Sequence, residues 1–133
     1  MIGRRGLIVA AIGVLALIGS HARAHDSGQW EASDPVIREW YRGLMQPDNP
    51  SASCCGESDA YFADVKVRGG KTFAVINDDR DDAPRGRPHI PNGTEFEVPN
   101  SKLKYDAGNP VGNAVLFVSR GGLVFCFVQG LQG

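Results

Sequence analysis

Ser53-Cys54-Cys55-Gly56-Glu57-Ser58-Asp59 separates the single helical pattern of the chain from a series of strand patterns, and it contains two of the three cysteines. Adjacent cysteines rarely bond to each other, because their Cα atoms lie about 3.8 Å apart whereas a relaxed disulfide needs roughly 4.4–6.8 Å. We therefore expect one of them to bond with Cys126, the only other cysteine. We write this bridge as Cys55–Cys126 and keep Cys54 as the alternative partner. Either bridge would tie the start of the sheet to its last strand and leave one thiol over.

The first 24 residues have the pattern of a secretory signal peptide. Arg4 and Arg5 give the positive start, residues 7–18 are an apolar run broken only by Gly13, and Ala22-Arg23-Ala24 matches a cleavage site. The apolar run is shorter than the about 20 residues that a membrane-spanning helix needs. We therefore expect cleavage after Ala24, no membrane span in the mature chain, and a periplasmic or secreted protein. In such an oxidising compartment a disulfide persists.

The mature chain, 25–133, is long enough for one domain with its own core. Loss of Arg4, Arg5 and Arg23 leaves 11 basic residues against 15 acidic ones. This negative balance argues against nucleic acid and anionic membrane surfaces as partners, since both attract basic patches.

Residues 33–46 carry the pattern of an amphipathic helix, with Ser33 as N-cap, Pro35 in the first turn and Pro47 as the stop. Its apolar face is Val36, Ile37, Trp40, Tyr41 and Leu44. A loop over 47–53 follows. Strand patterns then cover 61–67, 72–77, 94–98, 102–105, 114–118 and 123–128. The last two are apolar on both faces and should be central. We predict an α+β fold, in which one N-terminal helix packs on a mostly antiparallel sheet of about five or six strands that can curl into a small barrel.

The most acidic run is Asn77-Asp78-Asp79-Arg80-Asp81-Asp82. Calcium loops of the EF-hand type need acidic residues at alternate positions, then a glycine and a distant glutamate, and this run lacks that spacing. Arg80 interrupts the run, and Arg85 and Arg87 follow it closely. We interpret it as a solvated loop that partly neutralises itself.

A metal or redox function is one alternative that the sequence leaves open. The Cys54-Cys55 pair could act as thiols or ligands, with Glu57 and Asp59 close by, but there is no C-x-x-C or zinc spacing. Cleavage after Ala24 would also make His25 the N-terminus, where its amine and imidazole, together with His89, could chelate copper or another transition metal. We expect no resident cofactor.

A cysteine-dependent hydrolase is a further alternative, for which Cys55, His89 and Asp59 could supply nucleophile, base and acid. The leading interpretation is a non-enzymatic binding or structural module with no catalytic residues. Its partner would be a protein, an envelope polymer or a small molecule.

Several short motifs follow one another along the mature chain. They are Trp40-Tyr41-Arg42-Gly43-Leu44-Met45-Gln46-Pro47, the Ser53–Asp59 stretch, Gly86-Arg87-Pro88-His89, Val98-Pro99, Asn109-Pro110 and Cys126-Phe127. In these features the chain resembles a family of uncharacterised small exported proteobacterial proteins with a Ser-Cys-Cys-Gly-Glu-x-Asp motif. Looser relatives carry further cysteines, one of them where this chain has Ala60, so their disulfide pattern does not transfer whole. The resemblance implies an exported domain and no particular activity.

Overall fold

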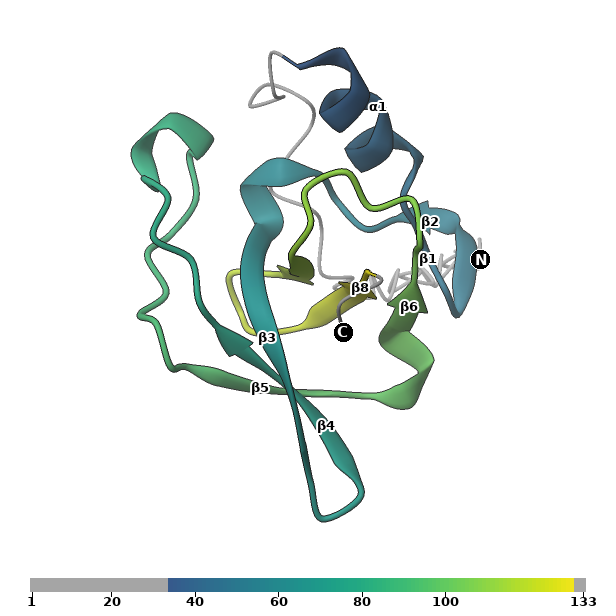
Figure 1. Cartoon of the computed structure of the whole chain (residues 1–133), viewed down its shortest axis with the longest axis vertical. Coiled ribbons are helices and arrows are strands. Elements are labelled where there is room, and N and C mark those ends of the chain that lie inside the picture. Colours follow the sequence, from purple (N-terminus) through teal and green to yellow (C-terminus); the bar gives the residue numbers. More distant parts are fainter. Residues whose placement is uncertain (1–33, 131–133) are drawn as a thin grey trace, which may run out of the picture.

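The computed structural model describes residues 34–130, and within them the chain forms one α-helix, three short 3-10 helices and eight strands in two sheets (Figure 1). This arrangement confirms the predicted α+β class. The predicted signal peptide, the cut after Ala24 and His25 lie outside the described residues and stay predictions. Within 34–130, no helix is long and apolar enough to cross a bilayer.

Helix α1 (Pro35–Gly43) is capped by Asp34. The Asp34 carboxylate accepts hydrogen bonds from the backbone N–H groups of Val36 at 2.8 Å and Ile37 at 3.3 Å. These are two of the N–H groups that have no partner inside a helix, so the cap stabilises the first turn. The residue that caps the helix is therefore Asp34, whereas the predicted cap, Ser33, lies outside the described residues.

The chain leaves the helix at Leu44, whose backbone is extended (φ −74°, ψ 117°). The following residues form a small antiparallel sheet of β1 (Met45–Gln46) and β2 (Asn49–Ser53). The prediction of a helix up to residue 46 and a loop over 47–53 is therefore wrong. Strand β2 is mostly exposed and has no alternation of apolar and polar residues, so the pattern that predicts strands is absent from it.

Six strands form the large sheet, in the order β5-β4-β3-β7-β8-β6. They are β3 (Ala60–Arg68), β4 (Lys71–Ile76), β5 (Glu95–Val98), β6 (Leu103–Tyr105), β7 (Ala114–Val118) and β8 (Val124–Gln129). Neighbours pair antiparallel except β6 and β8, which are parallel. Each predicted strand is present within one residue of its predicted bounds. Strands β7 and β8 are buried, and β7 is central as predicted, whereas β8 lies next to the edge strand β6. The mostly antiparallel sheet is confirmed, with one parallel pair.

The sheet is strongly curled, and the connection from β5 to β6 shows why. These strands lie at opposite edges of the sheet, which would be roughly 24 Å apart if six strands lay flat. The chain passes from Val98 to Leu103 through the 3-10 helix η3 (Asn100–Lys102), a connection that spans at most about 17 Å. The two edges must therefore approach each other, and Figure 1 shows the resulting half-barrel. Within the described residues no strand ladder joins β5 to β6, so the half-barrel is not closed.

Two apolar clusters lie on the two faces of this curled sheet. The concave cluster includes side chains from strands at both edges and from those between: Tyr61, Ala63, Ala74, Ile76, Val98, Leu116, Val118, Val124 and Phe127, with Leu103 packed against it. The convex cluster joins the sheet to the helix and the cysteines: Tyr41, Leu44, Cys54, Cys55, Ala60, Val115, Phe117, Phe125, Cys126 and Val128. Helix α1 thus packs on the sheet, as predicted, and it does so on the outside of the half-barrel. Val36, a member of the predicted apolar face of the helix, is 67% exposed.

Candidate functional site

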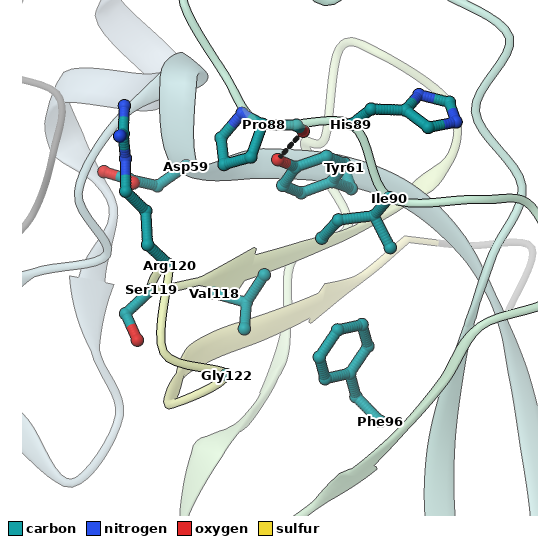
Figure 2. A pocket seen from close by; sticks show the side chains of 10 residues that line it. All are labelled: Asp59, Tyr61, Pro88, His89, Ile90, Phe96, Val118, Ser119, Arg120 and Gly122. Carbon is teal, nitrogen blue, oxygen red and sulfur yellow. Dashed lines mark hydrogen bonds between the residues drawn. The ribbon is translucent and has the colours of Figure 1, made fainter.

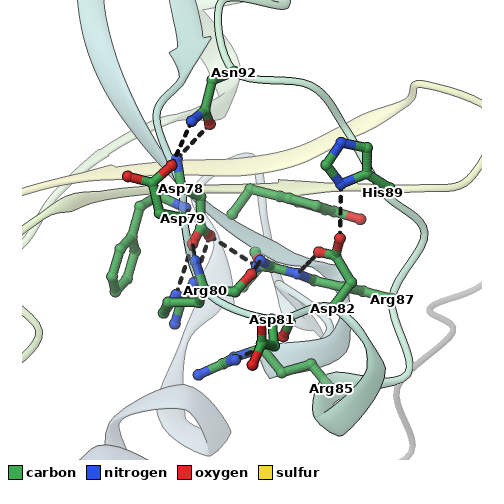
Figure 3. Close-up of polar contacts among 12 residues, drawn as sticks. Asp78, Asp79, Arg80, Asp81, Asp82, Arg85, Arg87, His89 and Asn92 are labelled. Atoms are coloured by element: carbon green, nitrogen blue, oxygen red, sulfur yellow. Dashed lines mark hydrogen bonds and ion pairs between the residues drawn. The ribbon is translucent and has the colours of Figure 1, made fainter.

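Asp78 accepts hydrogen bonds from several groups in a buried network of charged side chains (Figure 3). Its side chain is 1% exposed, and its carboxylate accepts hydrogen bonds from Arg80 (2.7 and 2.9 Å) and Arg87 (2.8 Å). The backbone N–H of Phe62 donates another at 2.9 Å. Burial alone would raise the pKa of Asp78, but these hydrogen bonds outweigh it and hold the pKa well below its usual range. The prediction of a solvated loop over 77–82 is therefore wrong for Asp78.

Arg87 is the buried cation of this network, with a side chain that is also 1% exposed. Besides Asp78, it donates hydrogen bonds to a carboxylate oxygen of Asp82 at 2.6 Å and to the backbone oxygens of Ala60 at 2.9 Å and Arg80 at 3.0 Å. Burial disfavours its charge, but the two carboxylates more than offset this and raise the pKa of Arg87. The network thereby fastens the loop between β4 and β5 to the first residue of β3.

Two of these guanidinium groups also lie against aromatic rings at the start of β3. The Arg80 guanidinium carbon is 3.5 Å from the centre of the Phe62 ring, and that of Arg87 is 4.6 Å from the centre of the Tyr61 ring. Cations within about 6 Å of a ring centre are attracted by the negative face of the ring. The network therefore positions the aromatic residues of β3 as well as the loop.

A half-open pocket of about 210 Å³ lies at one mouth of the half-barrel (Figure 2). Its apolar walls come from the concave cluster and the residues packed on it, namely Tyr61, Ile90, Phe96 and Val118. Four polar residues also line the pocket: Asp59, which is 3% exposed, and the more exposed His89, Ser119 and Arg120 at its opening. The pocket is therefore the accessible end of the concave core, with a polar rim.

Tyr61 forms one wall of this pocket, and its hydroxyl already has a hydrogen-bond partner within the protein. Its hydroxyl donates a hydrogen bond of 2.6 Å to the backbone oxygen of Pro88, which fixes the segment that passes over the pocket. Burial raises the pKa of Tyr61 to about 12, so the hydroxyl stays protonated and can keep donating at neutral pH. Tyr61 is 2% exposed and Arg87 lies over one face of its ring, so this wall offers a ligand only a small part of the ring, while the hydroxyl is satisfied within the protein.

His89 lies between this pocket and a second, more open hollow of about 400 Å³ beside the acidic loop. Its Nδ1 is 2.8 Å from a carboxylate oxygen of Asp82, and its side chain is 74% exposed. Burial would raise the pKa of Asp82, but hydrogen bonds from His89 and Arg87 lower it, so this carboxylate is ionised and accepts. Nδ1 is therefore the donor, and in the neutral ring Nε2 is left as an acceptor.

The structure contains the predicted bridge to Cys126, but its partner is Cys54, and the Cys55–Cys126 pairing is wrong. The two Cα atoms are 5.6 Å apart, within the relaxed range. Only one of the two adjacent cysteines faces β8, because the backbone turns at Cys55. Cys55 turns away with φ +89°, a conformation that costs a residue other than glycine about 1–3 kcal/mol. It keeps a buried thiol.

The other predicted sites are only partly assembled. Asp59 and His89 line the same pocket, but the acid that orients His89 is Asp82, and Cys55 belongs to the convex cluster instead. Cys54 cannot act as a thiolate ligand while it is in the bridge. Within residues 34–130, no group of three or more histidine, cysteine or acidic residues is placed to hold a metal.

Comparisons of the chain with family models, with curated proteins and with solved structures found no match. The resemblance to the exported family with the Ser-Cys-Cys motif therefore stays a prediction. What the structure adds is the geometry of one pocket and of the network beside it.

Sequence reasoning missed most of the residues that form this site. The sequence identifies Tyr61 and Phe96 only as strand residues and Asp78 only as a loop charge, and Arg87 only as a loop charge and a member of the Gly86–His89 motif. One signal was available: an arginine that follows an acidic run after a few residues can fold back onto it. Composition alone cannot show that Arg87 does so inside the protein, because its burial depends on Ala60 of another strand.

Proposed function

We propose that this chain is an exported, disulfide-stabilised module that binds a ligand at the mouth of its half-barrel. The observation that carries the proposal is the half-open pocket of about 210 Å³, which has apolar walls and a polar rim. Ligand sites are typically concave and mostly apolar, with a few polar groups that orient the ligand, and the mouths of β-barrels are common places for them. We propose further that the chain belongs to the exported family that its motifs resemble.

Support for export comes from two independent features. The first 24 residues have the composition of a secretory leader, and the Cys54–Cys126 bridge is of the kind that persists in oxidising compartments. Intact mass and non-reducing peptide mapping of protein exported by a bacterial host test this part. The expected result is a chain that begins at His25 and retains this bridge, and a retained leader would contradict it.

Binding can be tested by nuclear magnetic resonance with a mixture of small organic probes added to the mature protein. We expect amide shifts to cluster around Tyr61, Ile90 and Val118. The variant Ile90→Trp places a large side chain in the pocket and should abolish these shifts. Val67→Trp is the matched control, because Val67 is 70% exposed on the β3–β4 hairpin and does not line the pocket. Shifts that scatter over the surface, or that survive in Ile90→Trp, would refute binding at this pocket.

A further inference from the structure

We infer that the pocket receives a single neutral aromatic ring with one hydrogen-bonding substituent, as in a phenol. This inference rests on the proposed function, because it names the class of ligand for the same pocket. Three observations carry it: the volume of the pocket, the state of the polar atoms in its walls, and the charges on its rim.

The volume selects one ring. A cavity of about 150 Å³ lined by leucine, isoleucine and phenylalanine holds benzene, whereas drug-sized ligands occupy pockets of roughly 300–1,000 Å³. The pocket here has about 210 Å³, and part of this volume lies at its open rim. It therefore has room for a benzene ring and a small substituent, whereas a second fused ring would extend past the rim.

The walls select an aromatic ring and disfavour a sugar. Phe96 offers a half-buried ring and Tyr61 a small part of a buried one, and aromatic rings attract one another edge to face or in offset stacks. Two of the polar groups that line the pocket have limited capacity left: the Tyr61 hydroxyl donates to Pro88, and the Ser119 oxygen accepts from the Leu123 N–H at 3.0 Å and keeps only its O–H to donate. A sugar needs several hydrogen-bond partners, and each hydroxyl that is desolvated without one costs binding free energy.

The rim selects a neutral substituent that can both donate and accept. Asp59 and Arg120 lie at the same end of the pocket in Figure 2, and the charges of both act on the Tyr61 hydroxyl. One carboxylate and one guanidinium together favour neither a cationic nor an anionic ligand. A carboxylate has about four acceptor sites and a guanidinium five donors, so each can take a ligand hydroxyl in addition to its partners in the protein. A phenolic hydroxyl can donate to Asp59 and accept from Arg120.

Two sources could supply this chemistry, a free phenol or the side chain of a tyrosine in a peptide. The shared element is the hydroxylated ring, and both sources place it in the same pocket. A tyrosine would enter from the open side, where its backbone would pass over His89 or Arg120.

The test is a set of titrations of the mature protein, followed by nuclear magnetic resonance, with matched probes. Phenol is compared with cyclohexanol, 2-naphthol, benzoate and benzylamine, and N-acetyl-tyrosinamide tests the peptide source. We expect the dissociation constant of phenol to be at least about tenfold lower than that of each of these four comparison probes. Phe96→Ala should weaken phenol binding about 2–10-fold through loss of the ring contact, and Ile90→Trp should abolish it.

The outcomes separate this inference from the proposed function. If 2-naphthol, benzoate, benzylamine or cyclohexanol binds as tightly as phenol, and Ile90→Trp abolishes that binding, the ligand class is wrong and the binding function stands. If no probe shifts residues of the pocket in the wild type, both fail. Tighter binding of N-acetyl-tyrosinamide than of phenol supports the inference and assigns the ring to a peptide, and the reverse order assigns it to a free phenol.

Discussion

The substitution Asp78→Ala should destabilise the protein more than any substitution of an exposed acidic residue. Asp78 is almost fully buried, and its removal leaves Arg87 with one carboxylate fewer in a site that is 1% exposed. Breaking a buried ion pair by removing one partner costs about 3–5 kcal/mol, because the remaining charge stays desolvated. The Phe62 N–H also loses its acceptor, and an unsatisfied buried group costs about 1–3 kcal/mol. Since Arg87 keeps Asp82, we expect a total of about 3–5 kcal/mol.

Urea unfolding followed by circular dichroism, with the disulfide intact, measures this loss. The matched control is Asp64→Ala, since Asp64 is exposed and accepts a single hydrogen bond from Asn77. It should change stability by no more than about 0.5 kcal/mol. The double variant Asp78→Ala with Arg87→Met should lose less than the sum of the two single losses, by about 0.5–3 kcal/mol, because the pair acts as a unit.

The effect should also depend on pH, with a definite sign. The folded state holds the pKa of Asp78 below its unfolded value of about 3.9. A group with a lowered pKa stabilises the fold at pH values above the unfolded pKa, and this stabilisation is lost as pH falls below it. The difference between wild type and Asp78→Ala should thus be full at pH 7 and shrink below about pH 4. A difference under about 1 kcal/mol at pH 7 would refute the structural role of the network.

Four further predictions concern the bridge, the helix and the tyrosines. Cys126→Ser should lower the free energy of unfolding by about 2–5 kcal/mol, because the bridge to Cys54 closes a long loop, with a sequence separation of 72, and so restricts the unfolded chain. Unchanged thermal and urea midpoints would contradict this. Asp34→Ala should cost about 0.5–2 kcal/mol in thermal unfolding through loss of the helix cap, whereas Asp34→Asn should cost much less. Tyr41→Phe should change thermal stability by no more than about 1 kcal/mol, because within residues 34–130 the buried Tyr41 hydroxyl makes no well-formed hydrogen bond and has only the nearby Arg80 side chain to interact with. Burial raises the pKa of Tyr41 and of Tyr61 to about 12, so ultraviolet titration of the folded protein should show two tyrosines that ionise late. The free energy of unfolding should fall between about pH 10 and 12, because in this range the tyrosines of the unfolded chain lose their protons while those of the folded chain keep them.

Periodicity in the sequence was sufficient to predict the large sheet. Each of its strands either alternates apolar and polar residues or is apolar on both faces, and β7 and β8, which are apolar on both faces, are buried and flanked by a strand on each side. The small sheet of β1 and β2 could not be predicted, because its side chains are mostly exposed. Contacts from elsewhere hold it: Lys102 donates hydrogen bonds to the side chains of Gln46 and Asp48, and Lys104 donates one to the backbone oxygen of Met45.

The site was harder to predict than the sheet, because its residues come together only in the folded chain. The concave core needs the curl of the sheet, and the curl follows from the short connection between β5 and β6, which becomes visible only once the strand order is known. The choice of Cys54 over Cys55 depends likewise on which side chain faces β8. That orientation is set by a backbone turn at Cys55 with positive φ, which residue preferences do not predict outside glycine and asparagine.

The buried network and the pocket share residues, and this gives the network a role beyond stability. The Arg87 guanidinium lies over the ring of Tyr61 and donates a hydrogen bond to Asp82. Asp82 in turn accepts a hydrogen bond from His89, and the Tyr61 hydroxyl donates one to the backbone oxygen of Pro88. These contacts fix one wall of the pocket and the segment over it relative to each other. Apolar residues of similar volume could replace a buried ion pair at little cost in stability, but they would not supply directed contacts to the same groups. Loss of the network should therefore make the shape of the pocket more variable even in a variant that remains folded, because the Tyr61 wall and the segment over it would no longer be fixed relative to each other.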